Sequence, residues 1–357
     1  MPHTCDATAT VAYAFLVRES IPLWDVWVDY WKDCGDAVVP VAHSQAQGSV
    51  REELEAKLNT YGGRLVPTEN TLQGNPRWKW EMVQMMFALY RTAGEVKATN
   101  GCPPKWIHLV SESCAPVRKC SKVHSRLAQR PGSSHLTFMQ DPQGHGPWTG
   151  NEIPEELRPA AHTSQWITLA TTHALALAAA EEELRLKWKP HLEHAEAPLV
   201  NYLDIGGHGR IFGASEEWIF YTELTQRSMP FDTNGLSAAW ICCHGESHPN
   251  EANDRDGTVD LCHRAQSEGF DFVRKLNVDV GHVGDVMSGI RYCIETPLQT
   301  FTTCTKFECS SPGNDCCAPR EIGESATCRG DDYTPVRWVE RCGGDSPFHE
   351  GEYRCCK

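Results

Sequence analysis

Two apolar segments of strand length flank an amphipathic helix near the start of the chain, and this order constrains the fold more than any other feature. The apolar segments are Val11–Val17 and Ala37–Ala42. Between them, large apolar residues recur at helical spacing in Trp24–Trp31, which predicts a helix whose tryptophans pack in the core. A strand, a helix and a strand in this order form a right-handed crossover between parallel strands. The sequence therefore predicts an α/β fold.

The same alternation continues toward the middle of the chain. Leu65–Pro67 and Trp106–Val110 are further strand candidates, and Trp78–Tyr90 and Cys120–Arg130 are predicted helices. We therefore expect a Rossmann-type mixed sheet with flanking helices. The next segment, Gln140–Arg158, is rich in Gly, Pro and polar residues and predicts a long loop of the kind that is often functional.

Patterns in the following part of the chain are weaker. Thr163–Ala180 is predicted to be one helix, and Glu181–Lys189 is predicted to continue it with a solvated, charged face. Ala238–Cys243 is a strand candidate. Asp254-Arg255-Asp256 is the single Asp-x-Asp tripeptide of the chain, and the Asn and Gly residues around it predict a loop. Core packing is also the default expectation for Trp240.

Two of the predicted strands end in polar residues. His43 and Ser44 follow Ala37–Ala42, and Ser111-Glu112-Ser113 follows Trp106–Val110. Ligands of open α/β sheets bind beyond the carboxyl ends of the strands. We therefore expect His43 and Ser44 to lie where a donor substrate binds. For Glu112, contact with a ligand and capping of the next helix both remain open.

Adjacent carboxylates, Glu216 and Glu217, stand at the start of the aromatic stretch Ala214–Leu224. Ser215 is a suitable N-cap, so the stretch predicts a short helix with both acids in its first turn. One carboxylate is expected to face a cleft and the other to remain in solvent. A partly desolvated carboxylate beside aromatic side chains suits a general base, whereas two solvated glutamates would have no such role.

The charge balance of the chain limits its partners. The net charge is −14 and the pI is about 5.6. These values argue against nucleic acid or an anionic membrane surface as the main partner. They do not exclude an anionic small ligand, because the net charge of the whole chain does not reveal a local cluster of Arg and Lys.

Cysteine is concentrated at the end of the chain. Of the 17 cysteines, eight lie between Cys304 and Cys356, in a stretch with few aliphatic residues. Adjacent Cys pairs there favour disulfides over zinc, which needs paired Cys-x-x-Cys or His spacings. A segment this small needs such covalent links for stability. We expect an α/β domain over residues 1–298 and a Cys-rich, disulfide-stapled module over residues 299–357.

No apolar segment approaches the roughly 20 residues that span a bilayer. The N-terminal sequence MPHTCDATAT lacks the apolar core of a signal peptide. Disulfides nevertheless require entry into the secretory pathway. We therefore expect any membrane anchor to be absent from this chain.

Eight segments, in order along residues 11–276, resemble the core-2/I-branching glycosyltransferases (glycosyltransferase family 14), particularly their plant and algal branch. The most specific is Leu109–Pro116, LVSESCAP. The others are Phe15-Leu16 with Ile21–Trp24, Val41–Ser44, Trp78 or Trp80 with Met82-Val83, Ser164–Trp166 with His173-Ala174, Glu216-Glu217 with Thr222, Trp240 with His248-Pro249, and Phe272–Leu276. The Cys-rich tail lies outside the match.

The resemblance implies a GT-A-like fold and an inverting, metal-independent transfer from a UDP-sugar to a glycan or glycoprotein. UDP-GlcNAc, UDP-xylose and UDP-glucuronate are the donors it suggests. In the roles it implies, Glu217 is the catalytic base, and Arg274 and Lys275 hold the donor diphosphate. The acceptor-binding residues that we expect are Glu112, Ser113, Trp166, Glu216 and Trp240. No cofactor or metal is expected, and metal binding by Asp254-Arg255-Asp256 is a minor alternative. The implied location is the Golgi lumen, with a type II anchor that this sequence does not contain.

Some positions depart from the family pattern. The basic residue expected before Ser164-Gln165-Trp166 is missing, since the chain has Ala161-His162-Thr163. The aspartate expected before Trp240 is Ala239. These departures keep open an alternative from the binding class. In that alternative, an inactive relative binds glycan or cell wall through its Cys-rich tail.

Overall fold

The computed structural model describes residues 5, 9–72, 80–138, 155–161, 163–193, 215–238, 252–296, 333–339 and 350–356. The chain divides into two compact units, Met1–Leu298 and Gln299–Lys357. In the second unit, β11 (Tyr333–Val339) and β12 (Glu350–Cys356) form an antiparallel sheet. The cysteine pairings of this unit lie outside the described side chains, so the disulfide-stapled module stays a prediction.

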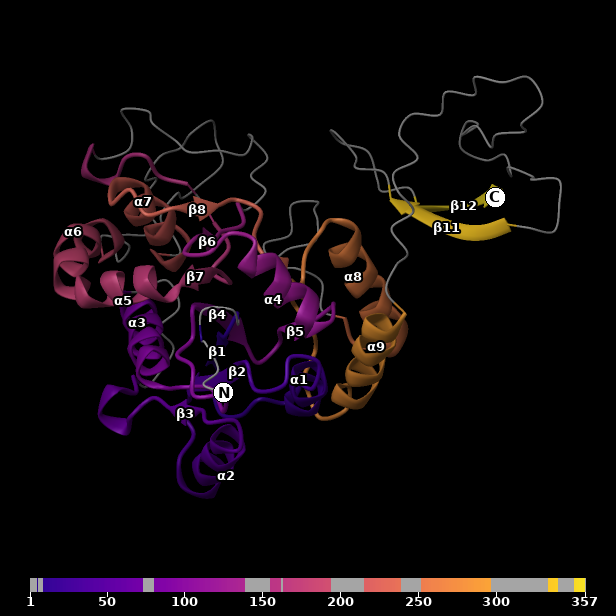
Figure 1. Ribbon diagram of the computed structural model, residues 1–357, viewed down its shortest axis with the longest axis horizontal. Helices are drawn as coiled ribbons and strands as arrows, with labels where there is room; N and C mark the ends of the chain where they lie inside the picture. Colours follow the sequence, from indigo (N-terminus) through magenta and orange to yellow (C-terminus); the bar gives the residue numbers. More distant parts are fainter. Residues whose placement is uncertain are drawn as a thin grey trace. The chain divides into compact units, whose positions relative to one another are not determined.

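The first unit is a mixed α/β structure around a seven-stranded sheet with the order β3-β2-β1-β4-β7-β6-β8 (Figure 1). The strands β3, β2, β1 and β4 are parallel, as the N-terminal pattern predicts, and β7 pairs antiparallel with β4. The strands are β1 (Val11–Leu16), β2 (Val38–His43), β3 (Arg64–Leu65), β4 (Trp106–Ser111), β6 (Ser134–His135), β7 (Thr168–Ala170) and β8 (Phe231–Asp232). A second, three-stranded sheet has the order β5-β10-β9, from β5 (Ala115–Pro116), β10 (Phe272–Val273) and β9 (Ser237–Ala238).

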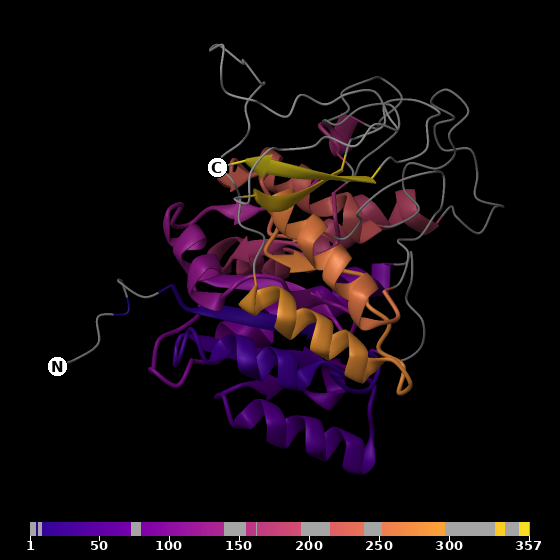
Figure 2. The same cartoon turned by 90° about the vertical axis from the view of Figure 1, so that its right-hand side faces the viewer.

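Helices cover both faces of the large sheet (Figure 1). They are α1 (Trp24–Trp31), α2 (Gly48–Asn59), α3 (Trp80–Glu95), α4 (Cys120–Ala128), α5 (Thr171–Ala179), α6 (Glu181–Glu193), α7 (Ile219–Gln226), α8 (Arg255–Ser267) and α9 (Val283–Glu295), with short 3-10 turns at Thr68–Asn70, Glu155–Leu157 and Ser215–Glu217. In Figure 1, α3 and α5 lie on one side of the sheet, and α1 and α4 lie on the other. The helices α8 and α9 lie side by side in both ribbon views (Figures 1 and 2).

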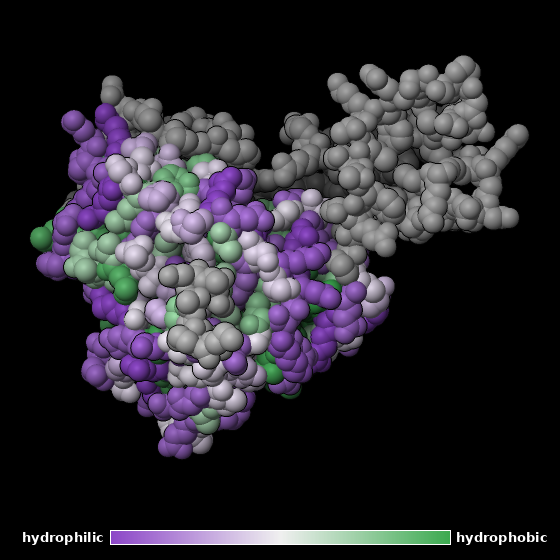
Figure 3. All heavy atoms as spheres, in the orientation of Figure 1, coloured by the Kyte–Doolittle hydropathy of each residue, from purple (hydrophilic) through white to green (hydrophobic). Residues whose placement is uncertain are grey.

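The tryptophans of α1 pack in the core, as their helical spacing predicts. Trp27 is fully buried and Trp31 is 1% exposed. The Trp27 ring lies 5.4 Å from the ring of Tyr13 on β1 and 5.8 Å from the ring of Phe272 on β10, measured between centroids. One helix therefore joins the large sheet to the small one. On the face drawn in Figure 3, hydrophilic side chains predominate and apolar ones are scattered.

The prediction of one helix over Thr163–Ala180 is wrong. Its first half is extended and contains β7, and α5 begins only at Thr171. The amide of Leu109 on β4 donates to the carbonyl of Ile167, and Trp106 pairs with Ala170. Sheet pairing therefore overrides the helical spacing of the apolar residues in this segment. The predicted continuation into Glu181–Lys189 is also wrong, because α6 is a separate helix.

Three disulfides join segments of the first unit within the described residues. They are Cys5–Cys102, Cys34–Cys120 and Cys262–Cys293, the last of which links α8 to α9. Among the described cysteines, Cys114 is a free, buried thiol. The first unit therefore contains disulfides, although the sequence predicts them for the Cys-rich tail. None of the helices in the described segments has the length and apolar character needed to cross a bilayer.

Replacing Trp27 by Ala is expected to lower the free energy of unfolding by about 3–5 kcal/mol, because a fully buried ring leaves a cavity. The matched control is Val50→Ala, at a side chain that is 43% exposed, which is expected to change it by no more than about 0.5 kcal/mol. Urea unfolding followed by circular dichroism measures both. Similar losses in the two variants would contradict the central position of Trp27.

Candidate active site

The carboxyl ends of the three central strands lie in one row. Leu16 at the end of β1 pairs with His43 on β2 and with Ser111 on β4. Since neighbouring strands lie about 4.8 Å apart, the backbones at His43 and Ser111 are roughly 10 Å apart. The two polar strand ends found in the sequence therefore meet at the same edge of the sheet, where ligands of α/β folds bind.

His43 and Ser44 have partners within the protein. Both side chains are 1% exposed. His43 Nε2 accepts a hydrogen bond from the Leu72 amide at 3.2 Å, and burial lowers the pKa of this histidine to about 4. The Ser44 hydroxyl donates to the Glu19 carbonyl at 2.7 Å and accepts from the Ala46 amide at 3.1 Å. These bonds fix the loops that follow β1 and β2, and donor binding by the two residues stays a prediction.

The turn after β4 is joined to the segment after β10. Ser113 is 5% exposed, and its carbonyl accepts a hydrogen bond from the Leu276 amide at 3.2 Å. Glu112 is half-buried in the same turn. Burial raises the pKa of the neighbouring Cys114 thiol, and the positive charge of Arg274 opposes this effect. The turn predicted to bind the acceptor therefore lies beside Arg274, although binding itself stays a prediction.

Arg274 is a half-buried cation directly after β10. Its guanidinium carbon lies 4.6 Å from the centroid of the Trp166 ring, and Trp166 itself is 4% exposed. The Nε atom of Arg274 is buried without a hydrogen-bond partner, and among the described residues the structure gives Arg274 no ion pair. Lys275 follows it and is also half-buried. The segment thus presents a guanidinium that is held in place by an aromatic ring and has donor capacity left for an anion.

A buried carboxylate holds the strand that precedes Arg274. Asp271 is 3% exposed and lies 3.1 Å from Arg118 Nε and 3.0 Å from Arg126 Nη1. Burial raises the pKa of Asp271, and the two arginines oppose that rise. The sequence motifs above do not include these three residues. An acid between two phenylalanines of a buried strand is the signal that predicts such a paired charge.

The two glutamates of the aromatic stretch lie in a 3-10 turn, Ser215–Glu217, which precedes α7. The expectation that one of the two acids remains in solvent is wrong, because Glu216 is 4% exposed and Glu217 is half-buried. Adjacent residues of a 3-10 turn point about 120° apart, so they face different surroundings. The Glu217 carbonyl accepts hydrogen bonds from the Thr163 amide at 2.7 Å and from its hydroxyl at 3.0 Å.

One short segment, Thr163–Trp166, connects the acidic and basic parts of this region. Its first residue binds the backbone of Glu217, and its last supports the guanidinium of Arg274. A bond of 3.1 Å from the Trp166 amide to the Ser164 hydroxyl stabilises the turn between them. This segment therefore connects the backbone of Glu217 with Arg274 and the turn after β4, and His43 and Ser44 lie two strands away. The acceptor role of Trp166 stays a prediction.

Two further sequence candidates have other outcomes. Trp240 lies outside the described residues. Asp254 does not lie in a loop as expected, since it is the N-cap of α8 and its side chain accepts from the Gly257 amide at 2.7 Å. Asp256 pairs with Arg255 in the first turn of that helix. The Asp254 carboxylate therefore begins a helix, which accounts for one acid of the Asp-x-Asp tripeptide.

Among known proteins, similarity to this chain is found only at the level of solved structures. No protein-family model matches it, and no curated protein is similar to it. Among solved structures, the apo form of mouse xyloside xylosyltransferase 1 is similar at 11% sequence identity and a TM-score of 0.34. The alignment covers 66% of this chain and 90% of the mouse protein.

A buried neutral histidine lies beneath the site. His108 on β4 is 1% exposed and is hydrogen-bonded to the Thr168 hydroxyl at 2.7 Å and to the Ser237 hydroxyl at 3.2 Å. Its ring stacks on Phe272 at 4.1 Å between centroids. Burial lowers the pKa of His108 to about 3. The imidazole thus connects β4, β7 and β9 in its uncharged form.

Acid is therefore expected to destabilise the fold. Unfolded histidines bind a proton near pH 6.5, whereas folded His43 and His108 do so near pH 4 and 3. Their stabilising contribution is present above pH 6.5 and is lost as the pH falls, at about 1.4 kcal/mol per pH unit for each histidine. Urea unfolding of the native chain and of His108→Gln between pH 7 and 5 measures the slopes. Equal slopes would contradict the assignment of His108 as a buried neutral group.

Proposed function

We propose that this protein is an inverting glycosyltransferase of the core-2/I-branching type, which moves a sugar from a UDP-sugar to a glycan or glycoprotein acceptor. The ordered sequence segments that resemble this family support the proposal, and so does their placement. Several segments that are far apart in the chain occupy one edge of a mostly parallel sheet. They are the strand ends at His43 and Ser111, the Thr163–Trp166 segment and Arg274. Open α/β sheets bind nucleotides at that edge.

The observation that supports the proposal most directly is that the segment Thr163–Trp166 contacts both Glu217 and Arg274. On one side is the half-buried Glu217, whose backbone binds Thr163. On the other is Arg274, which lies on Trp166 and whose buried Nε has no hydrogen-bond partner among the described residues. Glycosyl transfer needs these two properties close together, a base for the acceptor and a cation for the departing diphosphate.

The proposed reaction follows from these two groups. Glu217 accepts the proton of the acceptor hydroxyl, and the acceptor oxygen attacks the anomeric carbon of the donor sugar. The bond from that carbon to the diphosphate oxygen breaks on the opposite face, so the configuration inverts. UDP leaves with the electron pair of that bond, and Arg274 and Lys275 stabilise the charge that develops on it. Two fixed cations supply the charge that a divalent metal supplies in other transferases, so we propose a metal-independent reaction.

The remaining sequence candidates have supporting roles in this proposal. Glu112 and Ser113 are assigned to acceptor binding from the turn after β4, which is bonded to Leu276. Acceptor binding by Glu216 and Trp240 belongs to the same proposal, as does donor binding by His43 and Ser44 at the end of β2. The disulfides of the first unit fit the oxidising lumen of the secretory pathway. The Golgi and an anchor outside this chain belong to the same proposal.

Replacing Glu217 by Gln is expected to lower kcat by about 10²–10⁴-fold, because the amide cannot accept the proton. The affinity for UDP, measured by calorimetry, is expected to stay within about threefold. The matched control is Glu216→Gln, the neighbouring change of the same size and charge, which is expected to lower kcat far less. Release of UDP from candidate donors measures turnover. Equal losses in the two variants would show that Glu217 is not the base.

Replacing Arg274 by Gln is expected to weaken UDP binding at least about tenfold, because a charge-assisted contact to the diphosphate is lost. Arg255→Gln is the control, since Arg255 pairs with the exposed Asp256 and is expected to leave UDP affinity unchanged. Both measurements are made with and without EDTA, and EDTA is expected to have no effect. A native chain that fails to bind millimolar UDP would overturn the proposal and favour the inactive, glycan-binding alternative.

A further inference from the structure

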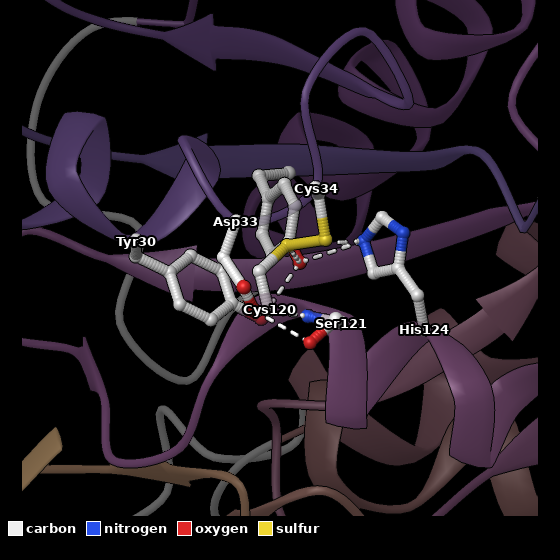
Figure 4. The surroundings of a disulfide bond; sticks show 7 residues. Tyr30, Asp33, Cys34, Cys120, Ser121 and His124 are labelled. Carbon is white, nitrogen blue, oxygen red and sulfur yellow. Dashed lines mark hydrogen bonds between the residues drawn. A yellow bond between two sulfur atoms is a disulfide. The ribbon is translucent and has the colours of Figure 1, made fainter. Parts of the chain in front are cut away.

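A second group of reactive side chains lies outside the candidate active site, where the end of α1 meets the start of α4. Cys34 follows α1, Cys120 is the first residue of α4, and a disulfide joins them. His124 lies one turn further along α4, with Nε2 3.5 Å from Cys120 Sγ. Figure 4 shows its imidazole ring facing the disulfide. We call these three residues the Cys34–Cys120–His124 cluster.

The cluster has the composition of a soft-metal site. One ligand atom from each of its three residues lies within 4.8 Å of the other two. Across the described segments of the chain, it is the one group of three His, Cys, Asp or Glu side chains with this geometry. Two thiolates and an imidazole are ligands that zinc prefers, and three protein ligands with one open position are typical of zinc sites that bind water or a substrate.

The imidazole of His124 is already oriented as a ligand. It is 7% exposed and lies between two neighbouring side chains. The Nε2 atom faces Cys120 Sγ and the Tyr13 hydroxyl, which is 3.3 Å away.

We propose that reduction of the Cys34–Cys120 disulfide creates a binding site for a zinc-class divalent cation, with the two thiolates and His124 Nε2 as ligands. The Cα atoms of the two cysteines are 5.6 Å apart. Bonds of about 2.3 Å to a tetrahedral ion place the two sulfurs about 3.8 Å apart, which side-chain rotation provides. The Tyr13 hydroxyl, 3.9 Å from Cys120 Sγ, borders the fourth position.

The reducing step needs a dithiol of the class that reduces protein disulfides. Its thiolate attacks Cys34 Sγ, which belongs to a half-buried residue, whereas Cys120 is fully buried. The disulfide breaks, and Cys120 leaves as a thiolate at the positive end of the α4 dipole. The second thiol of the reductant then attacks its own mixed-disulfide sulfur, which releases Cys34 and oxidises the dithiol. Binding of the cation displaces any thiol protons to solvent.

The ends of α1 and α4 are also held together without the disulfide. The Asp33 carboxylate accepts hydrogen bonds from the Ser121 amide at 2.9 Å and from its hydroxyl at 2.6 Å. Figure 4 shows this contact beside the disulfide. The two sulfurs therefore stay close to His124 after reduction. In reducing surroundings, the cation replaces the covalent link between the same two helix ends.

Cobalt titration of the full chain, reduced with a phosphine that leaves no competing thiol, tests the proposal. Sulfur-to-cobalt charge-transfer absorption is expected in the reduced chain, and Zn²⁺ is expected to abolish it. His124→Gln is expected to weaken cobalt binding at this site at least about 100-fold. This loss is larger than the one caused by removing a group that only hydrogen-bonds to a metal ligand. His124→Cys, which supplies a third thiolate, is expected to retain binding. The control Cys262→Ser removes a different disulfide and is expected to keep the signal.

Three outcomes would overturn the proposal. The first is equal cobalt absorption in the native chain and in His124→Gln, which would assign the metal to other thiols. The second is a reduced native chain without charge-transfer absorption. The third is loss of helical circular dichroism on reduction, because the site requires folded α1 and α4.

Discussion

Asp271 is a carboxylate buried in the interior, and the candidate active site depends on the two arginines that neutralise it. Arg118 and Arg126 also donate to main-chain carbonyls of the same segment, at Phe270 and Gly269. A buried charge without such partners would cost several kcal/mol. With them, the register of β10 is fixed. Arg274 follows β10 directly, so the same ion pairs determine where the cation enters the site.

The core fixes β10 from its other side. Phe272 stacks on the His108 ring of β4 and on the Trp27 ring of α1. The packing of the α/β core therefore also determines the position of the candidate site. Burial beneath the site also explains why His108 stays neutral, since the charged imidazolium would be desolvated there.

Covalent links act on different parts of the first unit. Cys5–Cys102 and Cys34–Cys120 close long loops around the N-terminal strands, with separations of 97 and 86 residues. Cys262–Cys293 closes a shorter loop between α8 and α9. Restricting the unfolded chain in this way stabilises a fold by about 3–5 kcal/mol per long loop. The Cys34–Cys120 disulfide is also the one at which we propose a metal site.

The sequence by itself determined the elements with clear periodicity. The strand–helix–strand start, the buried face of Trp24–Trp31 and the polar ends of β2 and β4 follow from local patterns, because period and turn chemistry are local properties. The boundary between β7 and α5 did not follow, since pairing with β4 is a contact between distant segments. The same holds for Asp254, whose Asn- and Gly-rich surroundings resemble a loop until α8 packs beside α9.

For the site, the resemblance selected Glu217, Arg274 and Lys275 as candidates, and their roles remain proposals. Only the tertiary structure decided that Glu216 is buried and that Trp166 supports a guanidinium. It also decided that Asp271 positions β10. Burial and charge pairing depend on which segments meet in space, so a local pattern can indicate a buried charge but not its partners.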